Sequence, residues 1–155
     1  MFKNTIFITL LLFTMSCGYE PLNSKKNKIN AGNFSIAQIN FIGDREINIK
    51  IKEKLSSYSN VTKERNYTLN IESESLKRTI AKDIKGNPSL FDLSIKIIVQ
   101  LKRGDNTGTK FIFNENFKYD NNEDKFEMKR YEREIKHNLA QTISNSLITK
   151  LSNLQ

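Results

Sequence analysis

The chain has 155 residues, one cysteine and a formal net charge of +8 at pH 7. This length suits a single domain that buries a substantial hydrophobic core. One cysteine excludes an internal disulfide, so packing alone must hold the fold.

A short apolar run opens the chain and ends beside the only cysteine. Ile6 to Met15 is long enough for the core of a secretory signal but too short to span a bilayer. Small Ser16 precedes Cys17, as in bacterial lipoprotein signals, although Thr14 and Met15 depart from the usual aliphatic and small residues. We therefore predict that residues 1–16 are removed and that Cys17 is lipidated. The alternative is a plain signal peptide that ends near a cysteine by chance.

The predicted export of this basic protein limits which acidic molecules it can bind. Removing Lys3 with the signal peptide leaves a mature charge of 8 − 1 = +7. An exported chain does not meet nucleic acid, so anionic lipid headgroups or an acidic protein are the expected partners. The alternative is that the abundant lysines are simply solvated.

The mature chain divides into a tether and a domain. Residues 17–33 are predicted to be the lipidated cysteine and a flexible tether, because Asn23 to Asn33 is rich in Lys and Asn and almost devoid of apolar residues. Residues 34–155 are predicted to fold. The first strand begins near Phe34, and its imperfect alternation indicates a slip at Gln38.

A helix is predicted next, from Arg45 to Ser57, with Asp44 as its N-cap. Its apolar residues, spaced by three or four, are Ile47, Ile51, Leu55 and Tyr58. Ile47, Ile49 and Ile51 also alternate as in a strand, but Glu53, Lys54 and Leu55 favour the helix.

Three strands are predicted to follow, because apolar residues alternate with polar ones. The first contains Tyr67, Leu69 and Ile71 and continues weakly to Lys77 and Arg78 at its far end. Residues 81–89 predict a turn or loop. The next two strands are predicted from two runs: Phe91, Leu93, Ile95, Ile97, Val99 and Leu101, then Phe111, Phe113, Phe117 and Tyr119.

A long helix completes the predicted fold. From Met128 onward its apolar stripe consists of Tyr131, Ile135, Leu139, Ile143, Leu147, Leu151 and Leu154. The order β-α-β-β-β-α predicts an α+β two-layer sandwich, in which two helices cover one face of a four-stranded sheet. The second face of the sheet would remain open.

The sequence contains no pattern that predicts catalysis. His137 is the only histidine, and its neighbours Lys136 and Asn138 suggest a solvated helix position. We find no metal-ligand spacing, nucleophile elbow or phosphate loop. The chain is therefore expected to be a binding or scaffolding protein with no catalytic residues, no metal and no cofactor.

With the segment from Cys17 through Gly18, Tyr19, Glu20 and Pro21 to Leu22, and with this order of elements, the chain resembles the LptE family of lipopolysaccharide-assembly lipoproteins. The resemblance implies a lipoprotein of the outer membrane that faces the periplasm. It also implies a partner, the β-barrel translocon LptD, which the lipoprotein plugs and helps to assemble.

The same resemblance implies lipopolysaccharide binding near the second and third strands. The basic residues at that place are Lys77, Arg78, Lys82 and Lys85. Cationic side chains there would contact the phosphates of lipid A. An alternative function is a periplasm-facing auxiliary lipoprotein of a lipid or ABC transport system.

Overall fold

The structure is a computed structural model that describes residues 33–59, 61–104 and 108–154. Its elements are β1 (Phe34–Gly43), α3 (Arg45–Ser59), β2 (Arg65–Lys82), β3 (Pro88–Lys102), β4 (Lys110–Asp120) and α4 (Lys125–Asn153). The predicted order and the α+β class are confirmed. The predicted signal peptide, Cys17 and nearly all of the tether lie outside the described residues.

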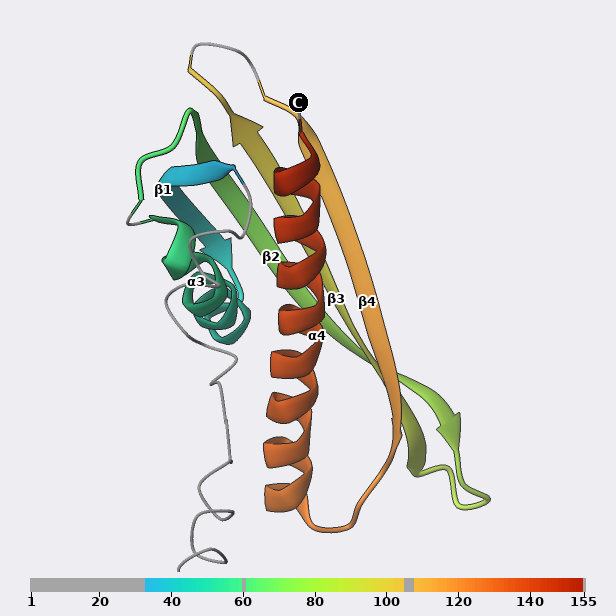
Figure 1. Ribbon diagram of the computed structural model, residues 1–155. Coiled ribbons are helices and arrows are strands. Elements are labelled where there is room, and N and C mark those ends of the chain that lie inside the picture. Colours follow the sequence, from blue (N-terminus) through green and yellow to red (C-terminus); the bar gives the residue numbers. More distant parts are fainter. Residues whose placement is uncertain (1–32, 60, 105–107, 155) are drawn as a thin grey trace, which may run out of the picture. The chain divides into compact units, whose positions relative to one another are not determined.

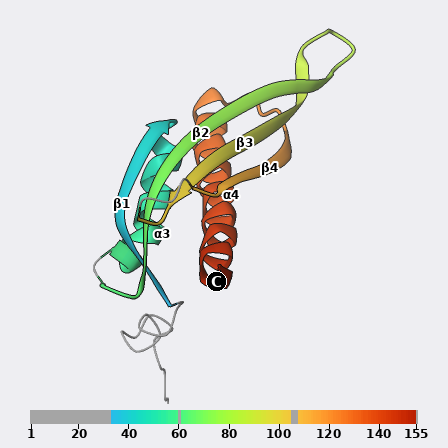
Figure 2. The same cartoon turned by 90° about the horizontal axis from the view of Figure 1, so that it is seen from above.

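The four strands form one mixed sheet in the order β1-β2-β3-β4. β1 and β2 are parallel, whereas β2, β3 and β4 pair antiparallel. Parallel neighbours need a crossover, and α3 provides it. Figures 1 and 2 show both helices on the same face of the sheet, which confirms the two-layer arrangement.

The core lies between the helices and the inner face of the sheet. The predicted alternation in β2 and β3 holds, since Leu69 and Ile97 are fully buried there. The helices meet this face with the buried residues Ile47, Ile51 and Leu55 of α3 and Ile135, Leu139, Ile143, Leu147 and Leu151 of α4. Each fully buried aliphatic side chain stabilises the fold by about 1.5–3 kcal/mol.

The predicted slip in the first strand is a β-bulge. Ile36 pairs with Tyr67, but Thr68 pairs with Gln38, so Ala37 is the extra residue. A bulge changes which residues point to the core. It allows Ile39 and Phe41 to pack against the core after Phe34 and Ile36 have done so.

Two aromatic positions differ from the prediction. Tyr131 of α4 and Phe117 of β4 are 43% and 44% exposed, although both belong to predicted apolar stripes. Tyr131 contacts the buried Tyr119 edge-on, with ring centres 5.9 Å apart. The apolar stripe of α4 therefore reaches the core fully only from Ile135 onward, apart from buried Met128.

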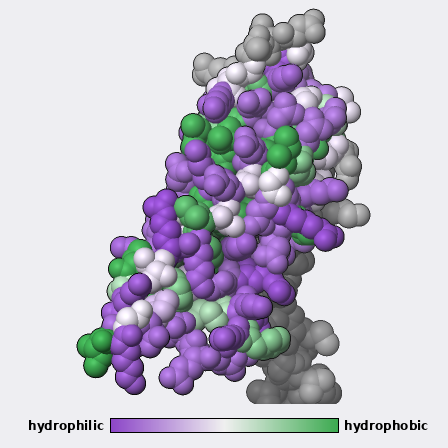
Figure 3. Space-filling view, turned by 180° about the vertical axis from the view of Figure 1, so that it is seen from behind, coloured by the Kyte–Doolittle hydropathy of each residue, from purple (hydrophilic) through white to green (hydrophobic). Residues whose placement is uncertain are grey.

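The face of the sheet away from the helices is open, as predicted. Figure 3 shows it as mostly hydrophilic, with separate small hydrophobic patches. Amide side chains form hydrogen bonds on this face: Gln38 donates to Asn40 within β1 at 2.9 Å, and Asn40 donates to Asn70 of β2 at 2.8 Å. Ile42 and Ile112 are exposed on the same sheet.

Candidate functional site

The predicted basic site lies on the β2–β3 hairpin, which projects beyond the two helices (Figure 2). β2 and β3 pair as far as Lys82 and Pro88, with register shifts around Ala81. The hairpin is thus longer than predicted, and the loop expected at 81–89 is only the turn 83–87. No apolar alternation marks these strand ends, because no helix covers them.

Asp83 closes the turn. Its Oδ1 accepts the backbone N–H groups of Asn87 and Lys85, each at 2.8 Å, and its Oδ2 accepts the side-chain amide of Asn87 at 3.2 Å. These hydrogen bonds, led by that of the Asn87 backbone, lower the pKa of the Asp83 carboxyl. The carboxylate is therefore used within the turn and fixes the shape of the tip.

Lys77 contacts a residue of α4. Its Nζ forms an ion pair with Glu132 of α4 and lies 3.8 Å from the centre of the Phe91 ring. Tyr119 donates its hydroxyl to the same carboxylate at 2.9 Å, and burial and Glu132 raise the pKa of Tyr119. The expectation that Lys77 ends the strand is wrong: Lys77 is an interior strand residue that binds the domain's own Glu132.

Arg78, Lys82 and Lys85 remain candidates. Arg78 also lies inside β2, not at its end, and pairs with Asp92 of β3 in the strand register. Lys82 is the last residue of β2, and Lys85 lies in the turn. All three are exposed, and within the described part of the chain no ion pair involves them.

The same hairpin exposes aliphatic side chains. Leu76 and Ile80 are 42% and 43% exposed, and Ile84 at the tip is fully exposed. Exposed aliphatic groups beside unpaired cations suit a ligand that is both anionic and apolar. Sequence reasoning found the cations but missed the aliphatic residues, because an isolated Ile in a polar turn gives no periodic pattern.

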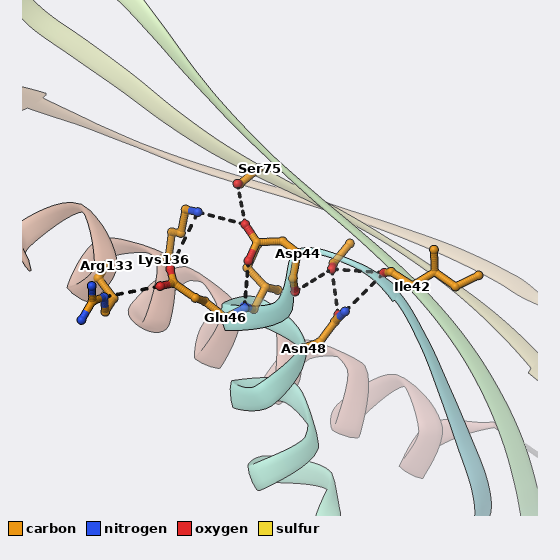
Figure 4. A network of polar contacts seen from close by, with 9 residues as sticks. Ile42, Asp44, Glu46, Asn48, Ser75, Arg133 and Lys136 are labelled. Atoms are coloured by element: carbon orange, nitrogen blue, oxygen red, sulfur yellow. Dashed lines mark hydrogen bonds and ion pairs between the residues drawn. The ribbon is translucent and has the colours of Figure 1, made fainter. Parts of the chain in front are cut away.

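A second polar cluster joins four elements and is structural (Figure 4). Asp44 caps α3, since its Oδ1 accepts the N–H groups of Glu46 and Ile47 at 2.9 and 3.3 Å. Its Oδ2 accepts Ser75 of β2 at 2.7 Å and pairs with Lys136 of α4 at 2.9 Å. The predicted cap is confirmed.

Electrostatics around Asp44 favour its charged form. Burial opposes the charge, but the hydrogen bonds from Lys136, Ser75 and Ile47 outweigh it and lower the pKa of Asp44. Lys136 is 92 residues away in sequence. No local pattern could have indicated this partner.

A hollow of about 710 Å³ lies between the end of β4 and the start of α4. It is lined by Phe117, Tyr131 and Met128, but also by Asp120, Glu123, Glu127, Arg130 and Glu134. So many charges do not suit an acyl chain. The hollow thus gives no support to a lipid carrier.

The described residues include neither a metal-binding cluster nor a membrane-spanning helix. Within 33–59, 61–104 and 108–154, no group of three His, Cys, Asp or Glu side chains could hold a metal ion. No helix in these ranges is long and apolar enough to cross a bilayer. His137 lies half-buried on α4, and its solvated, non-catalytic role remains a prediction.

No protein-family model matches the sequence, and no curated protein matches it either. Solved structures do share the fold. Rare lipoprotein B from Shewanella oneidensis is 15% identical with a TM-score of 0.54, and the match covers 73% of this chain and 95% of that one. A minor lipoprotein from Acinetobacter baumannii is 8% identical with a TM-score of 0.59, covering 77% and 90%.

Lipoprotein B from Nitrosomonas europaea is 14% identical with a TM-score of 0.54, and the match covers 77% of this chain and 83% of that one. At such identities the similarity establishes a common fold. The fold is therefore one that these bacterial lipoproteins also adopt.

Proposed function

We propose that this protein is a non-enzymatic outer-membrane lipoprotein that plugs and helps to assemble an LptD-like β-barrel and takes part in lipopolysaccharide transport. Three features support its lipoprotein character: the apolar run before Cys17, the single cysteine, and a fold shared with lipoproteins of three other bacteria. Lipidation at Cys17 would hold the periplasm-facing domain at the membrane.

The observation that carries the transport role is the projecting hairpin. Arg78, Lys82 and Lys85 form no ion pair with any described residue, and they lie on a hairpin that also exposes Ile80 and Ile84. Lipopolysaccharide combines phosphates with acyl chains, so it matches both properties. Charge-assisted hydrogen bonds from Arg and Lys would bind the phosphates, and the aliphatic side chains would contact the acyl groups.

The open sheet face supports the plug role. Its amide side chains, Gln38, Asn40 and Asn70, form hydrogen bonds along a surface that is mostly hydrophilic (Figure 3). The interiors of large outer-membrane barrels are polar. A hydrophilic face of this kind suits a protein seated in such a lumen better than one seated in lipid.

Co-purification tests the partner. The native protein is extracted in mild detergent, and mass spectrometry identifies both its partner and its N-terminal peptide. We expect a large outer-membrane β-barrel together with an acylated Cys17. An acylated protein that brings an inner-membrane transporter instead would support an auxiliary lipoprotein and contradict the plug, and an unmodified Cys17 would contradict anchoring.

Neutralising the hairpin tests the ligand. We expect the triple variant Arg78→Ala, Lys82→Ala, Lys85→Ala to bind lipopolysaccharide at least about tenfold more weakly, because the loss of even one charged hydrogen bond, about 1.5–3 kcal/mol, corresponds to about tenfold or more. The matched control is Lys52→Ala, Lys125→Ala, Lys129→Ala, which removes three exposed cations from the helices. Equal affinities of the two variants, measured with purified lipopolysaccharide, would contradict a hairpin site.

A further inference from the structure

A second basic surface lies at the opposite end of the domain from the hairpin. We call it the tether end and define it by residues 33–34, 61–66, 102–104, 108–110 and 150–154. Figure 1 shows these segments together, where β1 and β2 begin, β3 ends and α4 ends. It contains the six basic residues Lys63, Arg65, Lys102, Arg103, Lys110 and Lys150.

Strand register and side-chain contacts place these residues at one end. Arg65 lies beside Phe34 in the register of β1 and β2, and its side chain donates to the backbone oxygens of Asn33 and Leu154. Lys102 pairs with Thr68 near the start of β2, and Lys110 pairs with Gln100 near the end of β3. These contacts join β1, β2, β3, β4 and α4 at a single surface.

Three of the basic residues at the tether end have no ion-pair partner among the described residues. Glu64 is the one carboxylate among the side chains described in these segments. Lys102, Arg103 and Lys110 are exposed, and none takes part in an ion pair within the described part of the chain. By contrast, Arg133 and Lys136 in the first half of α4 are paired with Glu46 and Asp44. Lys102, Arg103 and Lys110 therefore form a group of exposed cations without ion pairs at the tether end, as Arg78, Lys82 and Lys85 do on the hairpin.

We infer that the tether end is a docking surface for the anionic phospholipid headgroups of the membrane in which Cys17 is anchored. The inference rests on the proposed anchoring at Cys17. Asn33 is the first described residue of the domain and follows Cys17 by 16 residues in sequence, so anchoring at Cys17 would keep this end, on average, nearest to the lipid. Basic residues within a Debye length of an anionic surface, about 8–10 Å, are attracted to it.

The tether end and the hairpin are separate sites. α4 has 29 residues and is thus about 43 Å long, and its C-terminal end contacts Arg65 while Glu132, in its N-terminal third, contacts Lys77. Phospholipid at the tether end would orient the domain with the hairpin directed away from the membrane surface. In this orientation the hairpin cations can bind a ligand that does not come from the membrane surface in which Cys17 is anchored.

Vesicle flotation tests the docking surface without lipidation. The probe is the mature chain from residue 17 with Cys17→Ser, mixed with phosphatidylcholine vesicles that contain or lack phosphatidylglycerol. We expect binding that requires phosphatidylglycerol and weakens as salt rises. In the variant Lys102→Gln, Arg103→Gln, Lys110→Gln the partition coefficient should fall about 100-fold.

The matched control is Lys52→Gln, Lys125→Gln, Lys129→Gln, which removes three positive charges outside the tether end. Its binding should weaken only by the small amount that the lower net charge of the protein causes. Circular dichroism would verify that both variants fold. Equal losses in the two variants, or binding that does not need phosphatidylglycerol, would overturn the docking surface. If the vesicles do not bind the probe but a β-barrel still co-purifies with the native protein, only the docking surface is overturned. If the native protein binds vesicles but its Cys17 carries no acyl group, the proposed anchoring is overturned.

Discussion

We expect Asp44→Ala to lower the free energy of unfolding by about 3 kcal/mol. The substitution removes an N-cap, which contributes about 1 kcal/mol. It also leaves Lys136 without its partner at 2.9 Å, and both side chains are mostly buried, at 17% and 22% exposed. Lys136 then keeps only Glu46, at 3.9 Å, and a mostly buried charge with so distant a partner is destabilising. Urea denaturation at pH 7 measures the change.

Asp124 offers a matched control within the same chain. It caps α4 as Asp44 caps α3, because its Oδ1 accepts the N–H groups of Phe126 and Glu127 at 2.8 and 3.1 Å. Its surroundings are exposed. Asp124→Ala should therefore lose only the cap, about 1 kcal/mol. Equal losses in the two variants would show that the bonds of Asp44 to Lys136 and Ser75 add nothing to stability.

The pH dependence gives an independent readout of the same residue. The pKa of Asp44 is lowered in the fold from its ordinary value of 3.8. Its stabilisation is then complete above that ordinary value and is lost as pH falls through the lower, folded pKa. Between pH 7 and pH 3 the wild-type protein should lose more stability than Asp44→Asn does. Parallel losses would contradict the assignment.

The elements predicted correctly from sequence are those with a strong local pattern. The three aliphatic residues of α3 and the cap at Asp44 lie within one short window, and β3 alternates from Phe91 to Lys102. The bulge after Ile36 was visible because the apolar positions change parity there. Such patterns arise from burial against a single partner layer.

The hairpin could not be predicted in the same way. β2 extends to Lys82 although nothing covers its last residues, so the strand continues through cross-strand hydrogen bonds without apolar alternation. Lys77 illustrates the consequence for the candidate site. From the sequence it is one of four equivalent cations, but Glu132, 55 residues later, neutralises it. Pairings at this separation depend on the packing of α4 across the sheet.

The tether end could not be predicted from the sequence either. Its basic residues lie in or directly beside β2, β3, β4 and α4, and they are separated by up to 87 residues in sequence, from Lys63 to Lys150. No window along the chain contains more than a few of them. A surface of this kind becomes visible only when the strand ends are brought together by the sheet.

Gly43 ends β1 and precedes the cap of α3. Gly43 has φ of +99°, which L side chains rarely adopt, and a Cβ built there would lie 1.9 Å from the backbone oxygen of Ser73. That oxygen also accepts the N–H of Asp44 at 3.1 Å, so it is held in place by the junction. We expect Gly43→Ala to lower the free energy of unfolding by about 3 kcal/mol or more.

Gly86 in the hairpin turn distinguishes the two causes of the expected loss at Gly43, which are backbone strain and the contact with Ser73. It also has a positive φ, of +84°, but nothing lies within 4 Å of a Cβ built there. Gly86→Ala should therefore cost only the backbone strain, about 1–2 kcal/mol. A larger loss for Gly43→Ala, with urea unfolding as the measurement, assigns the difference to the contact with Ser73. Equal losses would mean that β2 moves aside, and the junction that orients α3 on the sheet would then be less rigid than its hydrogen bonds indicate.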